Sequence, residues 1–312
     1  MASLSDSGAD GKCVLLTGAR GFTGAYVRAE LEGAGYRVVG TVIADADAQE
    51  LVLDLTSLDA CRAVVQRVQP DFIVHLAAVS FVQHANPDEF YRVNVVGTTN
   101  LLQAASEPGL TPQRILIASS ANIYGNAGGV LTESQTPRPV NHYAASKLAM
   151  EYMIATWTDR LPIVVTRPFN YTGVGQEARF LVPKIVSHFA RRAEQIELGN
   201  LDVERDFSDV RDVARAYRLL MECDAASDSV VNICSGRVVA LRDVIEMMQQ
   251  IAQYQIEVKV NQAYVRMSEV KTLIGAPGRL QELTGDAGDV MAIPFRETLE
   301  WMYGAACSSE GT

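Results

Sequence analysis

Tyr143 and Lys147 are the pair of side chains in this sequence best suited to proton transfer. They stand four residues apart in YAASK (143–147), so on a helix they would share one face. An ammonium group about 4 Å from a phenol, at an effective dielectric constant of about 20, is worth roughly 4 kcal/mol. We therefore expect Lys147 to lower the Tyr143 pKa from its ordinary value of about 10 by up to about three units, with burial opposing part of the shift. Such a tyrosine can protonate a carbonyl oxygen or take a proton from a hydroxyl group.

A serine at the end of an apolar run could hold the same oxygen atom. The stretch ASSANIYG (118–125) offers Ser120 and, if the loop register differs, Ser119. The next two residues are Ala121 and Asn122, where a proton-exchanging carboxylate could have stood. The set therefore has a hydroxyl, a phenol and an ammonium group, but no carboxyl partner.

Three glycines form a candidate site for a dinucleotide. TGARGFTG (17–24) places Gly18, Gly21 and Gly24 between an apolar run and a helical pattern. Glycines let the backbone turn tightly and approach a pyrophosphate, which then lies at the N-terminus of the following helix. The spacing GxxGxxG is a variant of the dinucleotide fingerprint, so we predict a dinucleotide cofactor.

The residues after the second apolar run bear on the choice of cofactor. An Asp or Glu there would bind the adenosine ribose 2′-hydroxyl, but residues 41–42 are Thr and Val, and Asp45 and Asp47 stand slightly too late. Arg20 could pair with a 2′-phosphate, or it could be a solvated loop residue. This pattern favours NADP(H) over NAD(H). Asp54 suits a loop that binds the adenine amine, or it could cap a nearby helix.

Short apolar runs alternate with amphipathic stretches over the first half of the chain. Buried strands are predicted at 13–18, 36–43, 71–78, 113–120 and 162–170. Helices are predicted at 23–35, 57–70, 93–107 and 142–157. This alternation predicts an α/β fold with a Rossmann-type, doubly wound parallel sheet whose binding loops leave the C-terminal ends of the strands.

The alternation breaks near residue 170, which predicts a smaller C-terminal substrate lobe interleaved with the sheet. Further helices are expected at 180–193 and 241–253, another sheet strand at 230–236, and a strand of the smaller unit at 256–261. The predicted dinucleotide-binding domain covers 12–168, with 207–235 returning to the sheet. The lobe comprises 169–206 and 236–304, and 1–11 and 305–312 are expected to be flexible tails.

The composition argues against several classes of partner. The 312-residue chain carries a net charge of −10, whereas nucleic acids and anionic membranes require clustered Lys or Arg. No run reaches about 18 apolar residues, and the first residues lack the apolar core of a signal peptide. Five scattered cysteines without a CxxC pair fit a reduced, cytoplasmic protein, and no metal site is predicted.

The motifs occur in the order of a known enzyme family. TGARGFTG, VHLAA (74–78), SSANIYG, YAASK and RPFNYTG (167–173) resemble the extended short-chain dehydrogenase/reductase family over about residues 12–300. The resemblance implies Ser120, Tyr143 and Lys147 as the catalytic set. Tyr143 would be the acid or base, Ser120 would bind the reacting oxygen, and Lys147 would also hold the nicotinamide ribose.

The expected cofactor site gathers the glycine loop, the adenine loop, the loop after VHLAA and the catalytic helix. Its expected members are Gly18, Arg20, Gly21, Phe22, Thr23, Gly24, Asp54, Leu55, Leu76, Ala77, Ala78, Asn94, Tyr143, Lys147 and Arg167.

Later stretches carry a narrower resemblance. RPFNYTGVGQ, LGNLDVERDFSDVRDV (198–213), NICSG (232–236) and VRMSEVKTLIGAP (265–277) are similar to the GDP-mannose 4,6-dehydratase and GDP-6-deoxy-4-keto-mannose reductase branch, which implies a GDP-sugar substrate. Arg205 and Arg266 could clamp a diphosphate, and Glu269 could accept from a ribose hydroxyl. The expected substrate-binding residues are Ser80, Asn122, Asn170, Lys184, Leu198, Gly199, Asn200, Arg205, Arg266 and Glu269.

Within this branch the residues favour a reductase. The dehydratases resembled here carry a carboxylate at the places of Ala121 and Asn122, because eliminating water across C5–C6 of a hexose needs both a base and an acid. Hydride delivery to a ketone needs only an acid, which Tyr143 supplies. We therefore expect NAD(P)H-dependent reduction of the C4 ketone of GDP-4-keto-6-deoxy-mannose to a GDP-6-deoxyhexose such as GDP-rhamnose. The alternatives are a sugar-nucleotide 4-epimerase, a 4,6-dehydratase with another base, and a non-catalytic dinucleotide-binding regulator.

The resemblance also implies a homodimer. Two helices per subunit, near 93–107 and 142–157, would form a four-helix bundle. Ala144, Ala145, Leu148 and Met150 could pack there, or could be buried within one subunit.

Overall fold

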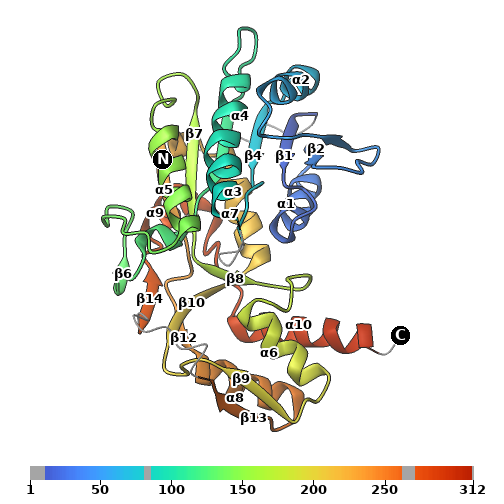
Figure 1. Cartoon of the computed structure of the whole chain (residues 1–312), viewed down its shortest axis with the longest axis vertical. Helices are drawn as coiled ribbons and strands as arrows, with labels where there is room; N and C mark the ends of the chain where they lie inside the picture. The colour runs from blue at the N-terminus through green and yellow to red at the C-terminus, as the bar shows by residue number, and fades with distance from the viewer. Residues whose placement is uncertain (1–10, 81–85, 262–270, 311–312) are drawn as a thin grey trace.

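The computed structural model describes residues 11–80, 86–261 and 271–310. Two parts lie one above the other in Figure 1, a larger sheet domain and a smaller lobe below it. This arrangement agrees with the predicted fold class.

A seven-stranded, all-parallel sheet forms the larger part, which confirms the α/β prediction. In spatial order its strands are β11 (Ser229–Ile233), β7 (Ile163–Pro168), β5 (Arg114–Ala118), β4 (Phe72–His75), β1 (Cys13–Thr17), β2 (Arg37–Val42) and β3 (Glu50–Val52). The central strands are covered on both faces, and all five residues of β1 are buried. Thr17 pairs in register with Thr41 of β2 and His75 of β4, so these three strands end level and their loops share one edge.

Helices cover both faces of this sheet. One face carries α2 (Leu58–Val68), α4 (Thr98–Ala105) and α5 (His142–Ile154), and the other carries α1 (Phe22–Gly33), α7 (Val210–Glu222) and α9 (Gly278–Thr284). A short helix α3 (Pro87–Tyr91) and a π-helical turn (Arg92–Gly97) lead into α4. Ser57, Asn141 and Asp209 cap α2, α5 and α7, each accepting a backbone N–H of the first turn.

The smaller lobe has its own sheets and core. Its larger sheet has the order β12 (Val238–Ala240), β10 (Glu204–Asp209), β14 (Thr272–Gly275) and β6 (Gly129–Leu131), and β8 (Asn170–Thr172) also pairs with β10. A second sheet pairs β13 (Glu257–Val260) with β9 (Gln195–Leu198). The helices of the lobe are α6 (Leu181–Ala190), α8 (Leu241–Ala252) and α10 (Phe295–Glu310). Along the whole described chain, 3-10 turns occur at Ala121–Tyr124, Asp224–Ala226 and Gly285–Ala287.

The structure differs from the sequence-based boundaries in three places. β6 belongs to the lobe sheet although it lies within 12–168, and α9 packs on the sheet domain although it lies within 236–304. The predicted tail from residue 305 is wrong, because α10 continues to Glu310. Leu299 and Met302 anchor this helix in the core of the lobe, and Ala306 packs against the same core.

Of the four apolar side chains expected in the dimer bundle, Ala145 and Leu148 are half-buried. Ala144 and Met150 are fully buried within the subunit. Tyr152 is 68% exposed and Val96 is 48% exposed. Across the residues described, every helix is too short or too polar to cross a bilayer.

Candidate active site

The loop after β1 has the shape that close approach to a phosphate requires. Gly18 has a φ of +72°, and a Cβ there would lie 2.8 Å from the Ala77 backbone nitrogen. A Cβ on Gly24 would lie 2.1 Å from the Gly18 carbonyl oxygen. Because α1 begins at Phe22, the unbonded N–H groups of its first turn lie beside this loop. The loop therefore fits a dinucleotide pyrophosphate.

A buried histidine joins the strand ends beneath this loop. Thr17 Oγ1 accepts from the backbone N–H groups of Leu76 and Ala77, at 3.1 Å each, so its own hydrogen is free for His75 Nδ1 at 2.7 Å. His75 Nε2 therefore carries the ring proton and donates to Thr98 Oγ1 at 2.9 Å. Burial lowers the pKa of His75 to about 3, which keeps the ring neutral.

Asn94 extends this network and supports the site from behind. Its amide accepts from Val79 N at 2.9 Å and donates to Val79 O at 3.1 Å and to Ser146 Oγ at 3.0 Å. Asn94 is fully buried, with three bonds made inside the protein. It therefore fixes the loop that carries Leu76, Ala77 and Ala78, rather than facing the cofactor as predicted.

Arg20 does not extend freely into solvent. Its guanidinium donates to the Asp45 carbonyl at 2.8 Å and forms an ion pair with Glu50 at 2.6 Å. Asp47 lies 3.7 Å away. The Glu50 side chain is 1% exposed, whereas Arg20 remains 49% exposed. Arg20 thus lies near the end of β2, and its positive charge is already paired with the carboxylate of Glu50.

Asp54 and Leu55 follow β3. Asp54 is exposed and accepts from the Thr56 backbone N–H at 2.8 Å and from its hydroxyl at 2.7 Å, bonds that lower its pKa. The cap of α2 is Ser57, so the capping alternative for Asp54 is wrong. Leu55 is buried in the core against α2.

Tyr171 is a residue of this edge that the sequence analysis missed. Its hydroxyl lies 2.7 Å from Thr23 Oγ1, and its ring stacks on Phe22 with centroids 6.1 Å apart. It also lies near enough to Tyr143 to raise that residue's pKa. Tyr171 therefore lies between the glycine loop and the predicted acid. The signal was an aromatic residue directly after the RPFN motif.

Tyr143 and Lys147 both lie on the buried face of α5. They are 8% and 4% exposed, and the Lys147 ammonium donates to the Ala118 carbonyl at 2.8 Å. This bond ties α5 to the end of β5, the strand that leads into Ser119 and Ser120.

The predicted direction of the Tyr143 pKa shift is wrong for this structure. Burial raises the pKa of Tyr143 to about 12, opposed by the Ser120 hydroxyl and supported by Tyr171. Desolvation dominates because the Lys147 ammonium is directed to the Ala118 carbonyl. Burial also lowers the pKa of Lys147 to about 8, against the effect of Glu151. Tyr143 is therefore protonated at neutral pH and can act as an acid.

Of the two candidate serines, the structure places Ser120 beside the Tyr143 hydroxyl. Ser120 Oγ accepts from the Asn122 backbone N–H at 3.2 Å and from its side-chain amide at 3.1 Å. Ser119 Oγ is buried and has no hydrogen-bond partner among the described residues.

Arg167 is not brought to the predicted cofactor site. Its guanidinium forms an ion pair with Glu151 at 2.6 Å and donates to the Tyr124 hydroxyl and the Glu133 carbonyl. Arg167 is 6% exposed, so this buried pair ties β7 to α5.

Two of the expected substrate residues lie along β8 and β10. The Asn170 amide is exposed and reaches the Asp206 carbonyl at 3.5 Å. Arg205 donates to the carbonyl groups of Glu204 and Lys271. Both residues therefore belong to the lobe sheet, Asn170 in β8 beside Phe207 and Arg205 near the start of β10, between β12 and β14.

Other expected substrate residues lie around β9. Lys184 donates to the Glu197 carbonyl at 2.8 Å, and Asn200 accepts from Asp202 N at 3.0 Å in the turn that contains Gly199. Leu198 is 2% exposed and packs in the lobe core, so its side chain is not directed at an open site in this structure.

Four expected substrate residues remain, of which Asn122 contacts Ser120 of the catalytic set. Ser80 and Asn122 are exposed. Arg266 and Glu269 lie outside the described residues.

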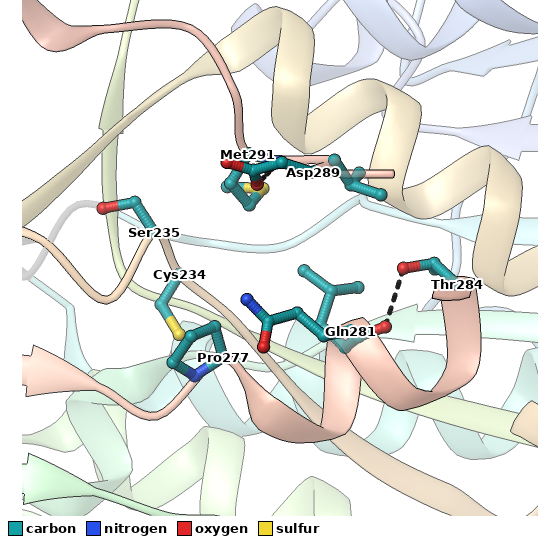
Figure 2. A pocket seen from close by; sticks show the side chains of 9 residues that line it. Cys234, Ser235, Pro277, Gln281, Thr284, Asp289 and Met291 are labelled. Carbon is teal, nitrogen blue, oxygen red and sulfur yellow. Dashed lines mark hydrogen bonds between the residues drawn. The ribbon is translucent and has the colours of Figure 1, made fainter. Parts of the chain in front are cut away.

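Two cavities lie away from Tyr143. Figure 2 shows one of about 10 Å³ between the loop after β11 and α9, lined by Cys234, Pro277, Gln281 and Thr284, too small for a sugar nucleotide. A groove of about 300 Å³ lies beside α5, β7 and β11. In the described part of the chain, no group of three or more His, Cys, Asp or Glu side chains could hold a metal ion.

Known proteins resemble this chain over most of its length. A family model described as GDP-mannose 4,6 dehydratase matches residues 15–287. GDP-6-deoxy-D-talose 4-dehydrogenase of Aggregatibacter actinomycetemcomitans is 38% identical over 293 residues, 93% of this chain and 96% of the relative. GDP-6-deoxy-D-mannose reductase of Pseudomonas aeruginosa is 37% identical over 229 residues, 69% of this chain and 74% of the relative.

Solved structures share the fold. A suggested epimerase from Burkholderia cenocepacia J2315 superposes with a TM-score of 0.90 and 46% identity, covering 96% of this chain and 100% of the other. RMD from Pseudomonas aeruginosa in complex with NADPH has a TM-score of 0.84 and 30% identity, covering 96% and 99%. MoeE5 with UDP-glucose and NAD has a TM-score of 0.84 and 27% identity, covering 95% and 99%. By its motifs, its fold and these matches, the chain belongs to the GDP-mannose 4,6 dehydratase family of extended short-chain dehydrogenases/reductases.

Proposed function

We propose that this protein reduces the C4 ketone of GDP-4-keto-6-deoxy-mannose with NADPH, giving a GDP-6-deoxyhexose such as GDP-rhamnose. The observation that carries the proposal is the contact between Ser120 and Asn122, because an amide stands where elimination of water would need a carboxylate. The names of the two relatives, a 4-dehydrogenase and a reductase of GDP-deoxysugars, support the same reaction class.

Each predicted catalytic side chain has one task in this reaction. A reduced nicotinamide, when bound, supplies the hydride that makes the C4 ketone an alkoxide. Tyr143, which burial keeps protonated, gives its phenolic proton to that oxygen, and Ser120 holds the oxygen in place. Lys147 would hold the cofactor ribose, and its charge would stabilise the phenolate that Tyr143 becomes when it gives up its proton. The ketone thus gains one hydride and one proton.

The proposed preference for NADPH rests on the adenosine end of the site. The end of β2 has no carboxylate at positions 41–43 to repel a 2′-phosphate, and the Arg20 guanidinium is half-exposed there. NADPH is also the cofactor in the RMD structure.

The test is to incubate the enzyme with GDP-4-keto-6-deoxy-mannose and each reduced cofactor. We expect nicotinamide absorbance to fall in proportion to keto-sugar consumed, with NMR identifying a C4 alcohol. Tyr143→Phe should lower kcat by about 100- to 10,000-fold while the cofactor still binds. Turnover of a GDP-sugar without net loss of reductant would instead favour a 4-epimerase; the solved structure that is 46% identical is described as an epimerase.

We also propose a homodimer through the faces of the π-helical turn and α5 that expose Val96 and Tyr152. These side chains would be covered in a four-helix bundle. Light scattering of the purified protein should give the mass of two subunits; the mass of one subunit would contradict the proposal.

A further inference from the structure

We propose that Asn122 is a positioning residue that makes the Ser120 hydroxyl an obligate hydrogen-bond donor toward the reacting oxygen. This inference rests on the proposed reductase function and names the side chain that sets the polarity of the site. It concerns a residue whose amide contacts the serine, not the acid itself.

The polarity follows from the bonds that Ser120 makes. Its Oγ accepts from the Asn122 backbone N–H at 3.2 Å and from the Asn122 side-chain amide at 3.1 Å. A hydroxyl oxygen has two lone pairs and one hydrogen. Because both lone pairs are engaged, Ser120 can make its next bond only by donating.

This donor lies beside the predicted acid. Ser120 is 5% exposed and Tyr143 8% exposed, and the two hydroxyl groups are near enough for a hydrogen bond with Ser120 to oppose the rise of the Tyr143 pKa that burial causes. A ketone oxygen that becomes an alkoxide needs converging donors, and an acceptor at the same place would repel it. The chain of donation therefore runs from Asn122 through Ser120 to the reacting oxygen.

Loop shape alone does not require the Asn122 amide. The backbone already closes this turn, with Ile123 N donating to Ser120 O at 3.3 Å and Gly125 N donating to Asn122 O at 3.0 Å. Arg138 N donates to Ile123 O at 2.8 Å from outside the turn. The side-chain amide is thus an additional group directed at Ser120.

The experiment replaces the amide by a carboxylate of the same size. Asn122→Asp should turn the Ser120 hydrogen toward the new acceptor and lower kcat by about 100-fold, with the KM for NADPH within about twofold of wild type. Protonating that carboxylate restores a donor. The ratio of the variant's kcat to the wild-type kcat should therefore rise as pH falls toward about 4. Asn122→Ala retains the backbone N–H that donates to Ser120, so its kcat should fall by about tenfold or less.

A double-mutant cycle with Ser120→Ala assigns the effect. In the Ser120→Ala background, adding Asn122→Asp should lower kcat by less than about a further threefold. The hydroxyl whose hydrogen the carboxylate would turn away is absent there. Thermal melting and NADPH binding confirm that each variant is folded. Equal losses for the Asp and Ala variants, losses that multiply with Ser120→Ala, or no recovery at acid pH would each overturn the proposal.

The outcome is separable from that of the proposed function. If the wild-type enzyme consumes no NADPH with the keto-sugar, the reductase proposal fails. If it does so and Asn122→Asp retains more than half of the wild-type kcat, only the role of Asn122 fails.

Discussion

Glu50 forms a 2.6 Å ion pair with Arg20 and, through its other oxygen, a 3.2 Å ion pair with Arg28. One almost fully enclosed carboxylate is thus shared by two guanidinium groups at the adenosine end of the predicted cofactor site. A 2′-phosphate at Arg20 would compete with this carboxylate for the same cation.

Glu50→Gln should therefore increase the preference for NADPH. Removing the carboxylate charge leaves Arg20 free to pair with the phosphate, and an effect of about 1.4 kcal/mol would raise the ratio of kcat/KM for NADPH to that for NADH about tenfold. Because both cofactors are measured on one preparation, this ratio does not depend on the fraction of folded enzyme.

Glu222→Gln is the matched control, because Glu222 pairs with Arg218 at 2.8 Å on the far side of the same domain. It should leave the ratio unchanged. A ratio that falls in Glu50→Gln would show that Glu50 instead orients Arg20 for the phosphate.

The reductase rate should fall as pH rises above about 8. Burial lowers the pKa of Lys147 to about 8, so its ammonium group is present below that pH and lost above it, while Tyr143 stays protonated throughout. A profile of kcat against pH measures this limb. In Lys147→Arg the charge persists, so the remaining activity should show no decline until at least about pH 10. An identical limb in both enzymes would assign it to another group.

His75 should make the fold sensitive to acid. Its folded pKa of about 3 lies below the unfolded value of about 6.5, so the unfolded chain binds more protons between these pH values and stability is lost as pH falls through this window. The slope from this group is at most about 1.4 kcal/mol per pH unit.

His75→Gln removes the titrating ring. Urea unfolding of both proteins at several pH values between 3 and 7 should give a shallower decline for the variant. Parallel curves would mean that other groups dominate.

Tyr171→Phe should weaken cofactor binding. The hydroxyl it removes lies 2.7 Å from Thr23, in the first turn of α1 where the pyrophosphate is predicted to bind. We expect the Kd for NADPH, measured by fluorescence titration, to rise about fivefold, because the substitution removes one hydrogen bond between neutral groups, worth about 1 kcal/mol, that orients Thr23.

Tyr26→Phe provides the comparison, since its hydroxyl donates to the Val174 carbonyl at 2.7 Å. That substitution should leave the Kd within about twofold of wild type. Similar changes in both variants would indicate a general loosening of the contact between the two parts of the chain.

Much of the fold was predictable because buried strands and amphipathic helices each have a characteristic local pattern of apolar residues. The predicted strands correspond to strands of the structure, although the run at 162–170 splits into β7 and β8. Helix α7 was missed because 198–213 was interpreted as a motif, yet Val213, Tyr217 and Leu220 have helical spacing and are buried. The placement of β6 in the lobe depends on pairing between segments far apart in sequence, which local patterns do not contain.

The motifs of the site could be predicted from the sequence, but the ion pairs and hydrogen bonds of its side chains could not. The glycine loop and the Tyr143–Lys147 helix follow from local spacing. Arg167 was misassigned because its acidic partner, Glu151, is chosen by tertiary packing, and the pairing of Arg20 with Glu50 could not be predicted for the same reason. The same holds for Tyr143, whose burial outweighs the charge of its neighbour.

The contact between Tyr171 and Thr23 also constrains the order of events in a catalytic cycle. Tyr171 pairs in register with Ser208 of β10 and its hydroxyl contacts Thr23 of α1, so this one residue joins the lobe sheet to the predicted pyrophosphate site. We therefore expect cofactor bound at the glycine loop to alter binding of the sugar nucleotide to the lobe, and steady-state inhibition by each product should show that the two substrates bind in a compulsory order.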